Sequence, residues 1–162
     1  MPMHDEKLRV RRTPEQLFDL VADVRSYPDF VPFIAAMRIV GEDWAGEDVR
    51  TMTAETAVGY KFLREKFTTK VLLDRPNLKI DVSYLSGPFE ALANHWIFEP
   101  LPDGSTMMDF CVEYEFRNPV LRMAFEGARD RAAHMILEAF AKEAERRYPD
   151  AVGAEDWSGE GA

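Results

Sequence analysis

The residues able to perform acid–base, nucleophilic or metal chemistry are few in this chain and widely spaced. The three histidines, His4, His95 and His134, fall in three separate predicted elements and lack the spacing of a helical metal site. The single cysteine, Cys111, has no second thiol with which to form a disulfide or a thiolate zinc site. No serine-nucleophile, phosphate-loop or dinucleotide-binding motif occurs. We therefore expect no catalytic residue, no metal and no cofactor.

Aromatic and methionine side chains carry more information, because they recur at the inward-facing positions of several predicted elements. In the predicted strand 106–116, for example, Phe110, Val112 and Tyr114 share one face, since alternate side chains of a strand point the same way. Ordinary core packing is the alternative for any single member of this set. The residues that we expect to line an apolar, ligand-binding pocket are Phe30, Phe33, Phe67, Tyr84, Phe89, Trp96, Phe98, Phe110, Val112, Tyr114, Met123, Phe125 and Met135.

Basic residues form two stripes on predicted strands. A solvated outer face is the simple explanation for such stripes. The alternatives are docking on anionic lipid headgroups, at about 1 kcal/mol per basic residue near the surface, or contact with RNA. The candidate docking residues are Lys7, Arg9 and Arg11 on the first strand, and Arg64, Lys66 and Lys70 on a later one.

The elements that must position these residues follow from local patterns. Residues 7–11 alternate as a half-buried strand, and Thr13 with Gln16 forms a capping box that begins a helix reaching Arg25. The proline-rich residues 26–33 predict a short helix or turns. Residues 41–46 read as a turn between the first two strands of a long β region. The strands expected there, joined by short turns as in an antiparallel meander, are 35–40, 49–58, 60–73, 78–84, 89–98 and 106–116.

The C-terminal part of the chain predicts one long amphipathic helix over residues 120–148, which begins after an Asn118 cap and Pro119. Its apolar positions follow a period of 3.6 residues and must lie against another element. A long helix across a strongly curved sheet encloses a cavity. We expect residues 1–148 to form one domain and the acidic residues 149–162 to form a disordered tail.

Four segments resemble the coenzyme Q-binding family of START-like proteins, within the polyketide cyclase superfamily. They are Tyr-Pro-Asp-Phe-Val-Pro at 27–32, Ser-Gly-Pro-Phe at 86–89, His-Trp-Ile-Phe-Glu-Pro-Leu at 95–101 and Tyr-Glu-Phe-Arg-Asn-Pro at 114–119. The resemblance covers nearly all of residues 7–148. It implies an α+β helix-grip (START/Bet v 1-like) fold, in which a curved antiparallel sheet wraps around a long C-terminal helix.

The resemblance also implies a function: non-catalytic binding, transport or chaperoning of a hydrophobic isoprenoid, with ubiquinone as the expected ligand, in support of respiratory electron transfer. A bacterial branch of the family is described instead as a ribosome-associating toxin that inhibits translation, and this alternative stays open. A second alternative is a cyclase-like enzyme, because helix-grip cavities host many functions. An enzyme would need a polar acid–base pair inside the cavity. The alternation of side chains along the predicted strands places no such pair there.

Charge and segment composition exclude several classes of partner. With 29 acidic and 20 basic residues the net charge is −9, which argues against a general nucleic-acid binder and against DNA as a partner. The longest apolar run, 30–37, contains Pro32 and is far below the ~18 residues of a membrane-spanning helix. The N-terminus lacks the apolar region of a secretory signal. We expect a cytoplasmic protein with transient contact at the inner membrane surface.

Overall fold

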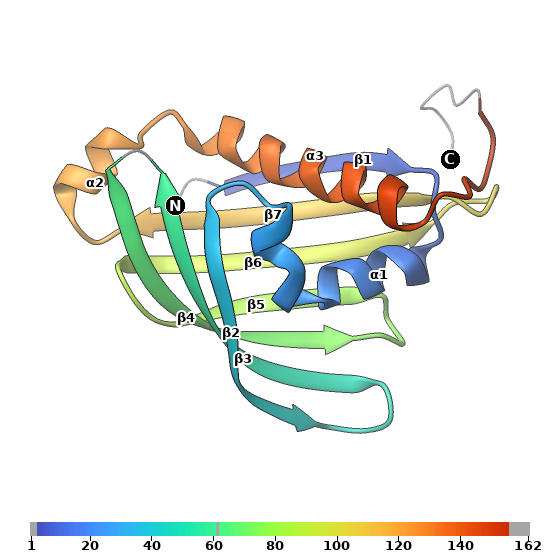
Figure 1. The fold of residues 1–162 in the computed structure, drawn as a ribbon, viewed down its shortest axis with the longest axis horizontal. Helices are drawn as coiled ribbons and strands as arrows, with labels where there is room; N and C mark the ends of the chain where they lie inside the picture. Colours follow the sequence, from blue (N-terminus) through green and yellow to red (C-terminus); the bar gives the residue numbers. More distant parts are fainter. Residues whose placement is uncertain (1–2, 61, 156–162) are drawn as a thin grey trace.

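A seven-stranded antiparallel sheet curves around a C-terminal helix (Figure 1). The computed structural model describes residues 3–60 and 62–155. The strands are β1 (Met3–Val10), β2 (Ile34–Trp44), β3 (Val49–Tyr60), β4 (Leu63–Asp74), β5 (Lys79–Ser86), β6 (Phe89–Pro100) and β7 (Thr106–Phe116). The helices are α1 (Pro14–Ala22), the 3₁₀ helix η1 (Val24–Asp29), α2 (Pro119–Ala124) and α3 (Arg129–Arg147).

The strand order β1-β7-β6-β5-β4-β3-β2 confirms the α+β helix-grip architecture. Strands β2 to β6 each pair with the next strand along the chain, and β1 completes the sheet by pairing with β7. The turn predicted at residues 41–46 is wrong in its first half, because β2 continues through Trp44. The β2–β3 register shifts between Ile39 and Gly41, and Gly41 stays paired within the strand, opposite Thr53.

Helix α1 closes one end of the sheet. Its start is the predicted capping box: the Gln16 N–H donates to the Thr13 hydroxyl at 3.2 Å, and the Thr13 N–H donates to Gln16 Oε1 at 3.0 Å. The buried face includes Leu17 and Phe18, and the Phe18 ring meets Phe98 of β6 edge-on at 6.1 Å. The interior at this end of the sheet is therefore filled by packed side chains.

The prediction of one continuous helix over residues 120–148 is wrong. Helix α2 ends at Ala124, and Gly127 has the left-handed φ of 83° before α3 begins at Arg129. Glycine adopts this conformation without a Cβ clash, so the chain can turn here. The break directs Phe125 toward Phe116, with ring centroids 5.8 Å apart, and α2 lies at the end of the molecule opposite α1 (Figure 1).

Two of the predicted docking residues hold the start of the C-terminal segment. Arg9 forms an ion pair with Asp103 at 2.6 Å and donates to the Ala154 carbonyl at 3.0 Å. Arg11 donates through its guanidinium to the Gly153 carbonyl, and its own carbonyl accepts from the Val152 N–H. Residues 149–155 of the predicted disordered tail thus include hydrogen-bonded positions along the end of β1. Residues 156–162 lie outside the described residues.

A chain of side chains fastens the edge strand β1 to α3. His4 hydrogen-bonds Asp130 at 2.9 Å and Glu6 at 2.8 Å, and Glu6 also hydrogen-bonds His134 at 2.6 Å. His134 in turn lies 3.3 Å from Glu138. The structure therefore brings together two of the histidines that the sequence places far apart. Among residues 3–60 and 62–155, no group of three His, Cys, Asp or Glu side chains is arranged to hold a metal ion.

The stability that this chain of contacts contributes should decline as the pH rises. Burial acts to lower the pKa of His4, but hydrogen bonds to Asp130 and Glu6 outweigh it and raise the pKa above 6.5. A hydrogen bond to Glu6 raises the pKa of His134. A raised histidine pKa stabilises the fold below the unfolded value of 6.5, and this stabilisation is lost as the pH passes the folded value.

Thermal unfolding of the wild type and of a His4→Gln, His134→Gln variant would test this. We expect the melting-temperature difference to be larger at pH 5.5 than at pH 8.5. An equal difference at both pH values would contradict the assignment.

Gly87 permits a close approach between the β5–β6 turn and β4. Its φ is +144°, and a Cβ atom there would lie 2.5 Å from Phe67 Cβ. We expect Gly87→Ala to lower the free energy of unfolding by about 3 kcal/mol, from backbone strain and overpacking together. Gly104→Ala is the matched control, since Gly104 has φ +91° but no atom near the added Cβ. Equal losses in urea unfolding of the two variants would refute the close-approach argument.

Candidate functional site: an apolar cavity

An apolar cavity of about 560 Å³ lies between the concave face of the sheet and α3. This volume is within the usual range for sites that bury small organic ligands. Strands β2 to β7 supply its floor and walls, and side chains of α3, including Ile136 and Phe140, cover it. The alternation of apolar and polar residues along the strands produces this face, because every second side chain points inward.

The closed end of the cavity is built from aromatic rings that pack at an angle to one another. Trp96 of β6 lies 4.5 Å from Phe110 of β7 and 4.9 Å from Phe140 of α3, measured between ring centroids. Trp96 and Phe140 are 3% and 1% exposed. These contacts join the sheet to the helix and set the inner limit of the cavity.

The open end is marked by lining residues that are also exposed to solvent. Tyr60 and Met135 both line the cavity, and 36% and 41% of their surfaces are exposed. Phe33 packs edge-on against Tyr60 at 5.0 Å, and Tyr60 lies 5.7 Å from Phe125. Phe33 has a φ of 74°, unusual for a residue other than glycine, and its carbonyl accepts a hydrogen bond from the Gly59 N–H. An aromatic rim thus surrounds the mouth.

Most of the predicted pocket residues line this cavity, although their binding role stays a prediction. Those that line it are Phe33, Phe67, Phe89, Trp96, Phe110, Val112, Tyr114, Phe125 and Met135. The parity of the late strands was therefore a sound guide to side-chain direction.

Four of the residues predicted to line the pocket lie outside this cavity. Phe98 is packed beneath α1, because β6 runs on past the closed end of the cavity. Tyr84 packs beside the cavity against Phe89, whose N–H donates to the Tyr84 hydroxyl at 3.0 Å. Met123 is 77% exposed, because α2 contacts the sheet through Leu121 and Arg122 instead.

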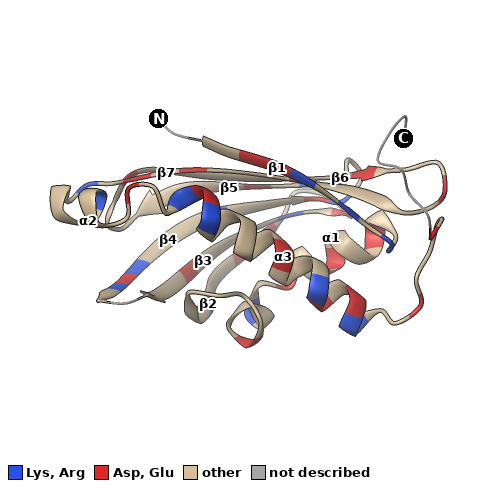
Figure 2. Ribbon diagram, turned by 90° about the horizontal axis from the view of Figure 1, so that it is seen from above, with Lys and Arg blue, Asp and Glu red and all other residues tan. Residues whose placement is uncertain are grey.

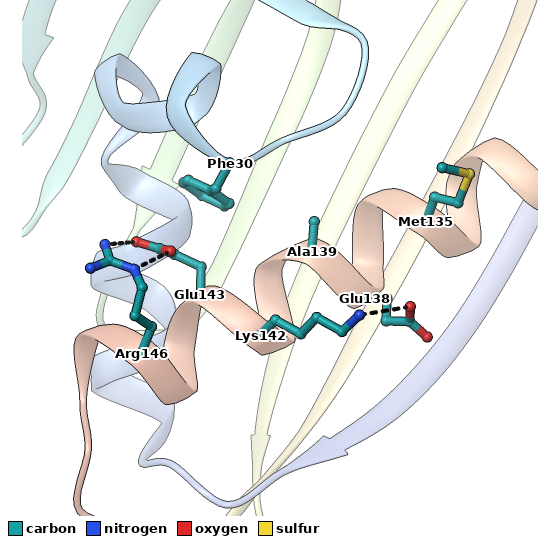
Figure 3. Close-up of a pocket in the computed structure, with 7 residues that line it drawn as sticks. All are labelled: Phe30, Met135, Glu138, Ala139, Lys142, Glu143 and Arg146. Carbon is teal, nitrogen blue, oxygen red and sulfur yellow. Dashed lines mark hydrogen bonds and ion pairs between the residues drawn. The ribbon is translucent and has the colours of Figure 1, made fainter.

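Phe30 is the fourth predicted residue outside the cavity. It lines a separate groove of about 370 Å³ beside α3 (Figure 3). Met135 lines both this groove and the main cavity. Ion pairs border the groove: Lys142 lies 3.5 Å from Glu138, and Arg146 lies 2.5 Å from the buried Glu143. Phe30 itself packs edge-on against Phe140 at 5.1 Å.

Sequence reasoning missed the polar members of the cavity wall. Thr56, Thr69 and Asn94 occupy inward positions on β3, β4 and β6, and Arg131 of α3 lines the cavity from an exposed position. Strand parity could have found the first three, but a search restricted to aromatic and methionine residues passed over them. Among the described residues that line the cavity there is no carboxylate and no histidine.

Two titratable groups of β7 with raised pKa values, Asp109 and Cys111, point away from the cavity. Burial and the neighbouring Asp5 raise the pKa of Asp109 to about 6. Burial and the carboxylates Asp5, Asp109 and Glu113 raise the pKa of the Cys111 thiol. His95 also faces outward, as its parity predicts, and lies 2.6 Å from Asp81. These groups lie on the outer side of the sheet from any ligand in the cavity.

The two basic stripes differ in their surroundings. On β1, Lys7 is exposed, but the Arg9 side chain is 11% exposed and ion-paired. On the outer face of β4, Arg64, Lys66 and Lys70 are all exposed. On β1 the acidic Asp5 and Glu6 come before the basic Lys7 and Arg9, and α3 carries charges of both signs along its length (Figure 2). The outer face of β4 is thus the more accessible of the two stripes.

Comparison with known proteins places this fold and cavity in a class of lipid carriers and cyclases. The chain belongs to the family described as polyketide cyclase / dehydrase and lipid transport, which matches residues 10–141. The ribosome association toxin RatA of Escherichia coli K12 is 32% identical over 148 residues, which cover 91% of this chain and 90% of RatA. The persistence and stress-resistance toxin PasT of E. coli O6:H1 has the same identity and coverage.

A further relative is the mitochondrial coenzyme Q-binding protein coq10 of Schizosaccharomyces pombe. It is 28% identical over 137 residues, which cover 83% of this chain and 82% of coq10. The expected START-like family is therefore confirmed, and the toxins match with higher identity than coq10 does. No helix within the described residues is long and apolar enough to cross a membrane.

Solved structures agree with this assignment. The solution structure of the 18 kDa protein CC1736 from Caulobacter crescentus is 39% identical, covers 93% of this chain and 100% of its own, and superposes with a TM-score of 0.77. The Zhui aromatase/cyclase from Streptomyces sp. R1128 is 18% identical with a TM-score of 0.75, and covers 99% of both chains. The second likeness concerns the fold alone.

The raised pKa of Cys111 makes its thiol a poor nucleophile. We expect it to react with a disulfide reagent at pH 7.5 at least several times more slowly than a free cysteine does, because less thiolate is present. Stopped-flow absorbance would measure the rate for the native and the urea-unfolded chain. A native rate equal to or above the unfolded rate would show an activated thiol instead.

Proposed function

We propose that the protein binds a hydrophobic isoprenoid lipid in the cavity and carries or shields it without chemical conversion. The observation that carries this proposal is the 560 Å³ apolar cavity, enclosed at the Trp96 end and open near Tyr60. Ubiquinone is the ligand that we propose, and the mitochondrial relative named as a coenzyme Q-binding protein supports that choice. The family description includes lipid transport, which supports the wider class.

The energetics suit a carrier. Burial of apolar chain contributes ~0.8 kcal/mol per CH₂ group, so ten carbons of an isoprenoid tail contribute roughly 8 kcal/mol in gross terms. Extraction of the same carbons from a bilayer costs about the same amount. The cavity therefore serves as a substitute for the bilayer interior, and exchange between the two is close to balanced.

Affinity should depend on tail length. We expect the affinity for ubiquinone analogues to rise over the first isoprene units, by less than ~0.8 kcal/mol per carbon because binding also orders the tail. It should then level off once the tail reaches the mouth at Tyr60. Isothermal titration calorimetry with tails of zero to about six units would measure this. Affinity independent of tail length would refute a tail-binding cavity.

A charge inside the cavity should abolish binding. Val112 lines the cavity on β7, and an ammonium group placed there lacks a carboxylate partner among the described cavity residues, so we expect Val112→Lys to lower quinone affinity by more than 100-fold. Met123→Lys is the matched control, since Met123 is 77% exposed and lies outside the cavity. Thermal unfolding of both variants would separate lost binding from lost folding. Tight quinone binding by a folded Val112→Lys variant would count against the site.

Association with the ribosome is the second candidate function. The relatives named ribosome association toxin favour it, at higher identity than the coenzyme Q-binding relative. In this chain the candidate surface is the outer face of β4, where Lys66 and Lys70 are exposed. RNA contact through basic residues releases counterions and is weakened by salt. This surface lies on the opposite side of the sheet from the cavity, so the two functions can be tested separately.

If the second candidate holds, Lys66→Glu with Lys70→Glu should remove cosedimentation with ribosomal subunits and leave quinone affinity unchanged. Arg25→Glu with Lys142→Glu is the control of equal charge, because both residues are exposed on the other side of the sheet. Cosedimentation in sucrose gradients at low and moderate salt would measure the effect. Equal losses in the two variants would mean that net charge, rather than the β4 face, decides the association.

A further inference from the structure

Polar side chains on the concave face form a small hydrogen-bonding patch inside the otherwise apolar cavity. Thr56 of β3 is 5% exposed and Thr69 of β4 is 3% exposed, and both line the cavity. In the β3–β4 register Thr56 lies opposite Phe67, and Thr69 lies opposite Ala54. The two threonines are therefore diagonal neighbours on one face of adjacent strands, within reach of a single small group.

The described protein groups leave the hydrogen-bonding capacity of these hydroxyls largely unused. The Thr56 hydroxyl donates to Met37 Sδ at 3.1 Å, and a thioether is a weak acceptor. The Thr69 hydroxyl makes no hydrogen bond to any of the described residues. Because Thr69 lines the cavity, its hydroxyl is open to a ligand there and can donate a hydrogen bond to it.

Asn94 adds an oriented amide from β6, two strands away from β4 on the same sheet. The Trp96 indole N–H donates to Asn94 Oδ1 at 2.9 Å, and Asn94 Nδ2 donates to the Cys111 carbonyl at 2.9 Å. These two bonds fix which way the amide points. Because the amide nitrogen carries two hydrogens, the second is available to a group in the cavity.

The charges of the lining residues limit which ligand groups the cavity can bind. Arg131 is the one formally charged side chain among the described lining residues, and it is exposed. A buried carboxylate or phosphate would lack a charged partner near Thr69 and Asn94 and would be strongly disfavoured. The patch therefore suits neutral oxygen acceptors, such as the carbonyl and ether oxygens of a substituted ring.

We propose that the ligand enters ring first, so that Thr69 and Asn94 donate hydrogen bonds to the oxygens of a neutral oxygenated ring, and Thr56 exchanges its weak bond to Met37 for one to the same ring. The tail then extends toward Tyr60 and Phe125 at the mouth. This inference rests on the proposed function and adds the orientation of the ligand and the residues that select its headgroup. The exposed apolar surface of Phe62, 64% exposed and 5.7 Å from the Phe125 ring, continues the path of the tail.

Thr69→Val tests the headgroup contact, since valine keeps the shape and removes the hydroxyl. The probes are a ubiquinone with a decyl tail and decylbenzene, which lacks the ring oxygens. We expect Thr69→Val to weaken quinone binding by about 3- to 10-fold, the effect of one hydrogen bond, and to leave decylbenzene affinity unchanged. The matched control is Thr53→Val, on the outer face of β3 opposite Lys70. It should change neither affinity.

The outcomes separate this inference from the proposed function. If the wild type binds neither probe, the proposed function fails. If the wild type binds both and Thr69→Val leaves quinone affinity unaltered, the ring-first orientation is wrong while the lipid-binding function stands. Equal weakening of both probes would show a packing defect rather than a lost hydrogen bond, and would likewise overturn the headgroup assignment.

A direct measurement of orientation makes the test independent of any variant. In NMR spectra of the wild-type complex, nuclear Overhauser contacts from the ring methoxy protons should reach the Thr69 and Val71 methyl groups, which both line the cavity. Contacts from the end of the tail should reach Phe33 and Phe125. The reverse pattern, with the ring at Phe33 and the tail at Val71, would refute the proposal.

Discussion

The cavity depends on how α3 packs against the sheet along its length. Near its C-terminal end Phe140 meets Trp96 at 4.9 Å and leaves no space between helix and sheet. Near its N-terminal end the residues that line the cavity include the alanines Ala132 and Ala133, and Ala128 just before the helix begins. Because the same helix carries a large ring at one end and methyl groups at the other, a volume persists where close packing would otherwise remove it.

The sequence predicted the parts of this arrangement that local patterns control. The capping box at Thr13, the seven antiparallel strands and the inward parity of Phe110, Val112 and Tyr114 all follow from spacing and turn residues. The break at Gly127 was missed because helical periodicity of apolar residues continues across it, and a single glycine is tolerated within helices. The left-handed φ of Gly127 accompanies the packing of Phe125 against Phe116. That packing is a tertiary contact, which local sequence patterns do not predict.

The sequence pattern could not predict the polar part of the site, for a different reason. Periodicity predicts that Thr69 points inward, but not that its neighbours leave its hydroxyl without a partner. In the same way, periodicity places Arg9 and Arg11 on one face of β1, but it does not predict their bonds to Asp103 and to residues 152–154. Satisfied and unsatisfied hydrogen bonds are properties of the folded chain, and they decide which of two similar residues is available to a partner.

The most direct test of lipid carriage is the chemical identity of what the protein holds. Protein purified from its own host without detergent can be extracted with organic solvent and the extract analysed by mass spectrometry. Binding in the cavity predicts an isoprenoid quinone present in a substantial molar fraction of the protein and absent from a folded Val112→Lys variant. Recovery of ribosomal RNA with the wild-type protein, and of no isoprenoid lipid, would contradict the account and favour the ribosome-associating function.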